Sequence, residues 1–163
     1  MNNANIAALE FWMSVLPFSL LAIWYWVPYC RKSSFAAGVT PLLLIHVFRH
    51  MGFFYLSTAA VAVPPPIEFA NPTAWGDLAA AVLAVLALLA VRYAAPLGKL
   101  AVWLFSVVGI GDLVVATINS NRYAVGEYHL GIAYLLWVIV VPALLVSHVM
   151  ILWLLLRTQR PAR

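Results

Sequence analysis

Charged residues are scarce in this sequence. Only 9% of its 163 residues are Asp, Glu, Lys or Arg, whereas 66% are hydrophobic, and the mean hydropathy is +1.00. In soluble globular domains roughly a quarter of the residues are charged. The composition therefore excludes an ordinary soluble domain and predicts an all-α integral membrane protein.

Cysteine is nearly absent as well, because Cys30 is the only one. A single cysteine excludes an internal disulfide, a cluster of thiolate metal ligands and a covalently attached c-type haem. The sequence also lacks a glycine-rich phosphate loop, a nucleophile elbow and the HExxH zinc motif. These absences remove several large classes of enzyme from consideration.

Long apolar runs are what the sequence has in abundance. A helix needs about 20 apolar residues to cross the hydrocarbon of a bilayer. Five runs of this kind occupy residues 11–29, 39–63, 74–93, 97–118 and 130–156. The connections between them are too short for a separate soluble domain, so residues 1–163 are expected to form a single bundle of five transmembrane helices.

Prolines mark several of the expected helix boundaries. The second span is expected to end before Pro64, and Asn71 is expected to cap the third span. Pro142 lies inside the fifth span and predicts a kink there, with a free carbonyl near Val138.

The basic residues predict the orientation of the bundle. One side carries seven of them: Arg31, Lys32, Arg92, Lys99, Arg157, Arg160 and Arg163. The other side carries only Arg122. The positive-inside rule therefore places the N-terminus outside and the C-terminus in the cytoplasm. Anionic lipid headgroups are sufficient partners for these cations, so no nucleic-acid partner is expected. The N-terminus lacks the basic segment of a signal peptide, so the first span is expected to be retained.

Four ionisable residues lie deep within the spans. His46 and Arg49 are in the second, Asp112 is in the fourth and His148 is in the fifth. A charged side chain at the bilayer centre costs from about 2.5 to more than 10 kcal/mol, so such residues usually face protein or a cavity. A rise of about 1.5 Å per residue puts all four in one layer near mid-bilayer. The sequence therefore predicts a buried polar site between three helices.

Arg49 must find an acceptor, because its guanidinium cannot lose its proton. Asp112 is the only acid at comparable depth and is the simplest partner; Asp77, nearer the surface, is the alternative. His46, Arg49 and His50 are spaced i, i+3 and i+4, which predicts that they share one helical face. A small and polar stripe on the fourth span predicts a helix–helix interface, and it comprises Ser106, Gly109, Asp112, Ala116 and Asn119.

The leading interpretation is a ligand-binding membrane protein. The expected ligand-binding residues are His46, Arg49, His50, Asp112, Asn119 and His148. The ligand is expected to be an apolar or amphipathic small molecule or lipid, or else a partner subunit or a second copy of the chain. An architectural ion pair between Arg49 and Asp112 is the alternative without function.

Two other functions remain open. A membrane-embedded isomerase could use His46, His50, Asp112 or His148 for proton transfer; its general arrangement is similar in kind to the emopamil-binding sterol isomerase group, whose motifs cannot be matched here residue by residue. A haem b electron carrier could use His46 and His148 as axial ligands. A metal site formed by His46, His50, His148 and Asp112 is a further chemical alternative.

Three segments carry a resemblance to other proteins. HVFRHMGFF, NPTAWGDLAAAVLA and VPALLVSHVM resemble segments of small uncharacterised bacterial inner-membrane proteins. The resemblance implies a multi-pass protein of the bacterial inner membrane, and it brings no assigned activity.

Overall fold

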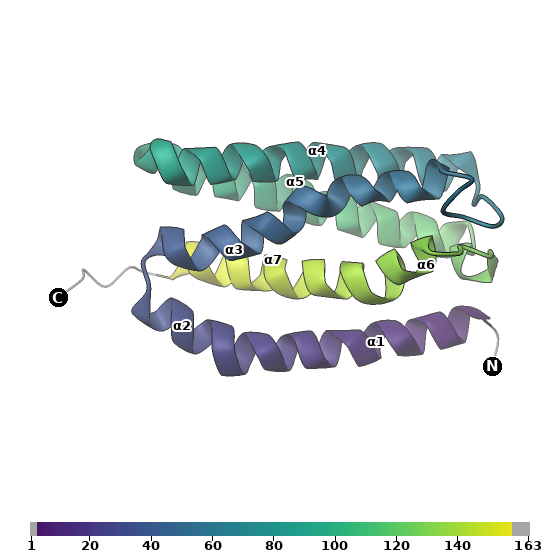
Figure 1. Cartoon of the computed structure of the whole chain (residues 1–163), viewed down its shortest axis with the longest axis horizontal. Coiled ribbons are helices and arrows are strands. Elements are labelled where there is room, and N and C mark those ends of the chain that lie inside the picture. Colours follow the sequence, from purple (N-terminus) through teal and green to yellow (C-terminus); the bar gives the residue numbers. More distant parts are fainter. Residues whose placement is uncertain (1–2, 158–163) are drawn as a thin grey trace.

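The computed structural model describes residues 3–157, and over that range the chain consists of helices joined by short connections (Figure 1). Five of these helices are long and apolar enough to cross a membrane: Asn3–Lys32, Phe35–Leu56, Ile67–Tyr93, Pro96–Arg122 and Ala133–Leu156. They run alternately in opposite directions (Figure 1). The predicted all-helical architecture with five such helices is confirmed.

Three of the long helices contain irregular segments. The first joins α1 (Asn3–Leu21), the π-helical η1 (Ala22–Trp26) and α2 (Val27–Lys32). The second joins α3 (Phe35–Val47) to the 3₁₀-helical η2 (Phe48–Leu56). The third and fourth are α4 (Ile67–Tyr93) and α5 (Ala95–Arg122), and the short η3 (Val125–Glu127) follows. The fifth joins α6 (Ala133–Leu135), the π-helical η4 (Leu136–Val140) and α7 (Val141–Leu156).

Each π-helical segment is followed, after one valine, by a proline. Pro28 and Pro142 each occupy the second position of the helix that follows the π segment. Proline cannot donate to the carbonyl four residues earlier and its ring clashes with that carbonyl, which for Pro142 is the one of Val138. A π turn widens the backbone locally and relieves this clash. A π-helical segment thus lies where Pro142 predicted a kink.

Several predicted boundaries were wrong. The second helix ends at Leu56 and not at residue 63. Residues 57–66 form a loop, in which the amides of Ala62 and Val63 donate hydrogen bonds to the carbonyl of His129. The third helix begins at Ile67, so Asn71 is not its cap. Because the backbone of Pro66 is extended, the helix starts immediately after it. Pro72 lacks an N–H, so only one backbone hydrogen bond is missing near the start of this helix. The third and fifth helices end at Tyr93 and Leu156, as predicted. The remaining ends differ from the predicted ones by one to eight residues, since apolarity alone does not mark a helix end.

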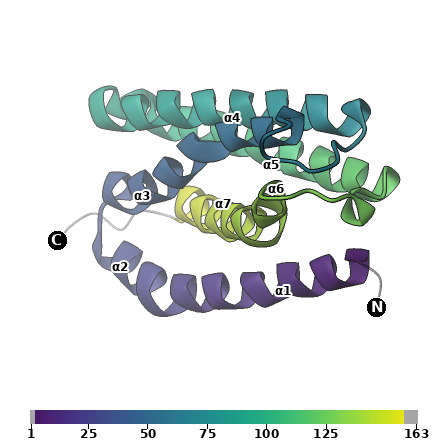
Figure 2. The same cartoon turned by 45° about the vertical axis from the view of Figure 1, so that its right-hand side comes forward.

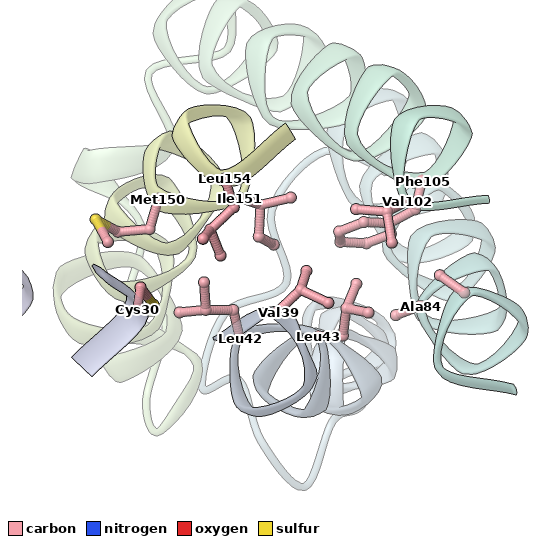
Figure 3. Packing of buried hydrophobic residues seen from close by; sticks show 11 residues of the cluster. Cys30, Val39, Leu42, Leu43, Ala84, Val102, Phe105, Met150, Ile151 and Leu154 are labelled. Carbon is pink, nitrogen blue, oxygen red and sulfur yellow. The ribbon is translucent and has the colours of Figure 1, made fainter. Parts of the chain in front are cut away.

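An apolar core fills the end of the bundle where the chain enters α3 and leaves α7 (Figure 3). We call this end the basic end. Here α2, α4 and α7 end and α5 begins (Figure 1), and these helix ends carry Arg31, Lys32, Arg92, Lys99 and Arg157. Arg122 is in the last turn of α5, at the opposite end. Arg160 and Arg163 lie outside the described residues. The core consists of Cys30, Val39, Leu42, Leu43, Ala84, Ala87, Val102, Phe105, Met150, Ile151 and Leu154. It closes the basic end with tightly packed apolar side chains.

A second apolar cluster lies toward the opposite end and includes Tyr55, Val61, Phe69, Val125 and Leu130. The deep polar residues occur between the two clusters along each helix. The first long helix lies on the outer side of α7 (Figures 1 and 2), where α1 packs on α7 and η4. Polar contacts also join the first and fifth long helices: the Tyr134 hydroxyl on α6 donates to Glu10 Oε2 at 2.5 Å, and Arg157, directly after α7, donates to the carbonyl of Cys30 at 2.9 Å.

Candidate functional site

Arg49 lies at the centre of the polar layer, with its side chain fully buried. Its Nε donates to Asp77 Oδ1 at 2.8 Å, and its Nη2 donates to Asp112 Oδ2. Its Nη1 donates to the carbonyl oxygen of Gly109 at 3.1 Å. The planar guanidinium can serve these three acceptors at once because its donors point in fixed, divergent directions. The predicted pair with Asp112 is confirmed, and Asp77, the alternative partner, binds the same guanidinium simultaneously.

Three glycines create the space in which this cluster is packed. A β-carbon on Gly52 would overlap the Asp77 carboxylate, and one on Gly76 would overlap that of Asp112. A β-carbon on Gly109 would stand 2.8 Å from His148 Cε1. This role of Gly52 and Gly76 was not predicted from the sequence. A glycine inside a span that carries buried charges was the available signal, because glycine permits close approach of another chain.

The buried histidines lie behind Arg49 and contact each other. His46 Nε2 lies 2.8 Å from Ser147 Oγ, whose own hydrogen is donated to the carbonyl of Leu144 at 2.8 Å. His46 must therefore donate through Nε2–H. His148 Nε2 lies 3.5 Å from Arg49 Nη1, which can only donate, so His148 presents an unprotonated nitrogen there. Each imidazole is thus assigned as a neutral tautomer from its hydrogen-bond partners.

His50 does not join the site, and the prediction that it shares a face with His46 and Arg49 was wrong. His50 is exposed, and its Nδ1 lies 3.1 Å from the carbonyl of Val47. The reason is the switch to 3₁₀ geometry at Phe48. With about three residues per turn, Arg49 stays in line with His46 while His50 points about 120° away.

A cavity of about 320 Å³ opens beside the Arg49 cluster. All five long helices contribute to its wall. Its polar lining consists of Arg49, Thr73, Asp77, Asp112, Thr117, Ser120 and Asn121. Its apolar lining includes Phe11, Trp12, Phe48, Met51, Tyr55, Phe69, Leu113, Leu136, Trp137, Val140, Val141 and Leu144. It lies at the lower end of the volume range of small-molecule sites, roughly 300–1,000 Å³, and shares their mainly apolar lining.

Only some of the predicted ligand-binding residues line the cavity. Arg49 and Asp112 line it, whereas His46, His148 and Asn119 do not. Of the residues predicted for acid–base chemistry, Asp112 is thus the one in contact with the cavity. Thr73 was not predicted as a site residue: it is 6% exposed, lines the cavity, and its hydroxyl has no hydrogen-bond partner. Nothing in the sequence distinguishes this threonine from one on a lipid-facing surface.

The histidine pair does not fit a haem. A bis-histidine haem needs an iron and a flat macrocycle between the two imidazoles. The ring centroids of His46 and His148 are 4.3 Å apart, and Phe105 stacks on His148 with its centroid at 5.1 Å. Rings in direct contact leave no space for a porphyrin. Within residues 3–157, moreover, no group of three or more His, Cys, Asp or Glu side chains is placed to hold a metal ion.

The chain belongs to the family described as "Domain of unknown function (DUF8737)", which matches residues 6–156. No curated protein and no solved structure matches it.

Proposed function

We propose that this protein is a multi-pass membrane protein that binds a small amphipathic molecule in the cavity beside Arg49. The observation that carries the proposal is the cavity itself, whose wall combines the Arg49 cluster with a majority of apolar side chains. Such a combination suits a ligand with one polar end and an apolar body.

The distribution of apolar and basic residues supports the membrane location. Large apolar side chains are exposed along all five long helices, for example Met13, Leu44, Leu86, Leu104 and Val149. In water these surfaces would drive aggregation, whereas lipid covers them without cost. The basic end corresponds to the cytoplasmic side by the positive-inside rule, which places the N-terminus outside. The bacterial inner membrane is the location that we propose.

Binding, rather than passage through the bundle, suits the arrangement of the cores. The apolar core at the basic end separates the polar layer from that end. Leu43 and Phe105 of this core are fully buried (Figure 3), and the ring of Phe105 contacts that of His46. A charged or polar solute could not cross this region without losing its hydration. The cavity therefore works as a one-sided pocket.

Two features argue against an ion pair that is only architectural. The Arg49 cluster borders a cavity, whereas an ion pair with a purely structural role is expected in a tightly packed interior. The buried Thr73 hydroxyl also lacks a partner, which costs free energy unless a ligand or water supplies one.

The test compares molecules that copurify with the protein in polymer-extracted native membranes. Ala116→Trp places an indole in the cavity, whereas Val115→Trp places it on the neighbouring exposed position as a matched control. We expect mass spectrometry to find a compound enriched with the wild type and with Val115→Trp and lost from Ala116→Trp. Equal small-molecule profiles for all three proteins would contradict the proposal.

A further inference from the structure

The charges around Arg49 do not balance. One guanidinium faces two carboxylates, those of Asp77 and Asp112. His46 and His148 are both assigned as neutral from their hydrogen bonds, so they contribute no charge. With both carboxyls ionised, one negative charge is unmatched in a largely buried site. Buried charges in proteins are normally neutralised, either by a proton on one of the carboxyls or by a further positive group beside them.

All three groups of the cluster line the cavity, but the two carboxylates are more accessible than the guanidinium. The side chains of Asp77 and Asp112 are 17% and 11% exposed, whereas that of Arg49 is 0% exposed. Arg49 engages one oxygen of each carboxylate. In the described part of the chain no hydrogen-bond donor is recorded for the second oxygen of either. A molecule in the cavity therefore meets acceptors that lack donors.

Thr73 gives an independent indication at the same place. The residue lines the cavity, and its hydroxyl is buried and has no hydrogen-bond partner. Thr73 and Asp77 are four residues apart on α4, which places their side chains on one face about 5–6 Å from each other. A single small donor group can therefore contact both side chains.

We propose that the polar end of the ligand is a protonated primary or secondary amine, an inference that rests on the binding function proposed above. An ammonium group supplies the missing positive charge. Its N–H groups donate to the free oxygens of Asp77 and Asp112 and to Thr73 Oγ1. The apolar body of the ligand lies against the rings and aliphatic side chains of the remaining wall. A quaternary ammonium would supply the charge without the donors, and an anion or a neutral alcohol would leave the charge unmatched.

The probe is tritiated decylamine, bound to the protein in nanodiscs of neutral phosphatidylcholine, with empty nanodiscs measuring partition into lipid. The competitors are unlabelled decylamine, decyltrimethylammonium, decanol and decanoate, which share one tail and differ in the polar end. We expect saturable binding, with decylamine displacing the probe at least about tenfold more effectively than decanol or decanoate.

Two variants separate charge from hydrogen bonding. Asp112→Asn should weaken both cationic probes by about tenfold or more and leave decanol unchanged. Thr73→Val keeps the shape and all charges, so it tests the inference even if Asp112→Asn fails to fold. It should weaken decylamine several-fold and leave decyltrimethylammonium unchanged, because only decylamine can donate to the hydroxyl.

The outcomes distinguish the amine from the binding function. In one outcome, decanol or decanoate displaces the probe as potently as decylamine does, and Ala116→Trp abolishes the binding. That result would contradict the proposed amine ligand and support the cavity as a binding site. Absence of saturable binding by every probe would overturn the amine as well, while the comparison of copurified molecules would decide on the binding function separately.

Discussion

Gly76 on α4 lies directly against the carboxylate of Asp112 on α5, so closely that a β-carbon at position 76 would overlap Asp112 Oδ1. The contact fixes how near the two helices approach at the level of the buried charges. It also holds the Asp112 carboxylate in the position where Arg49 Nη2 donates to it.

The first prediction is that Gly76→Ala destabilises the protein. The added methyl group displaces Asp112 or separates α4 from α5, and overpacking of this kind costs about 1–3 kcal/mol. Gly111→Ala is the matched control, because a β-carbon at Gly111 meets nothing within 4 Å. We expect the control to be neutral or to stabilise α5 by up to about 1 kcal/mol. Unfolding in mixed micelles with increasing sodium dodecyl sulfate measures both, and equal stabilities would contradict the packing described here.

The second prediction concerns the shared guanidinium. Arg49→Met leaves Asp77 and Asp112 buried without a cation, which should cost about 3–5 kcal/mol. Replacing both acids by asparagine in the same variant removes the uncompensated charges and should restore a large part of that loss. The same micelle titration tests this. A triple variant as unstable as Arg49→Met alone would show that the acids do not depend on Arg49.

The third prediction uses two buried serines on facing helices. Ser147 accepts from His46 and donates to the carbonyl of Leu144, so Ser147→Ala strands the His46 N–H and should cost about 1–3 kcal/mol. Ser106 is fully buried and its hydroxyl has no hydrogen-bond partner. Ser106→Ala should therefore be neutral or slightly stabilising. If thermal unfolding ranks the two variants the other way, the assigned tautomer of His46 is wrong.

The fourth prediction tests the orientation in the membrane. In a Cys30→Ala background, Thr58→Cys places a thiol in the loop after η2, and Tyr93→Cys places one at the basic end, where Tyr93 is 74% exposed. A membrane-impermeant maleimide should label Thr58→Cys in intact cells and Tyr93→Cys only after permeabilisation. The reverse labelling would invert the proposed topology.

The sequence alone, through its composition and periodicity, determined the class of structure and the ion pair between Arg49 and Asp112. Five apolar runs predict five long helices because only a helix satisfies its own backbone groups in lipid. Arg49 and Asp112 could be paired from depth alone, because a buried guanidinium needs an acceptor and a fixed rise per residue gives the depth of each side chain. The irregular backbone before Pro142 followed from the missing N–H.

The tertiary structure decided the rest. Depth along a helix says nothing of its rotation about its own axis or of which helix stands next to it. The simultaneous contact of Arg49 with Asp77 and the position of Gly76 opposite Asp112 depend on those two quantities. The loss of His50 from the site depends on the 3₁₀ turn at Phe48, which no residue in that segment signals. The cavity and the unpartnered Thr73 arise only where five helices leave space between them, because a cavity belongs to no single segment of the chain.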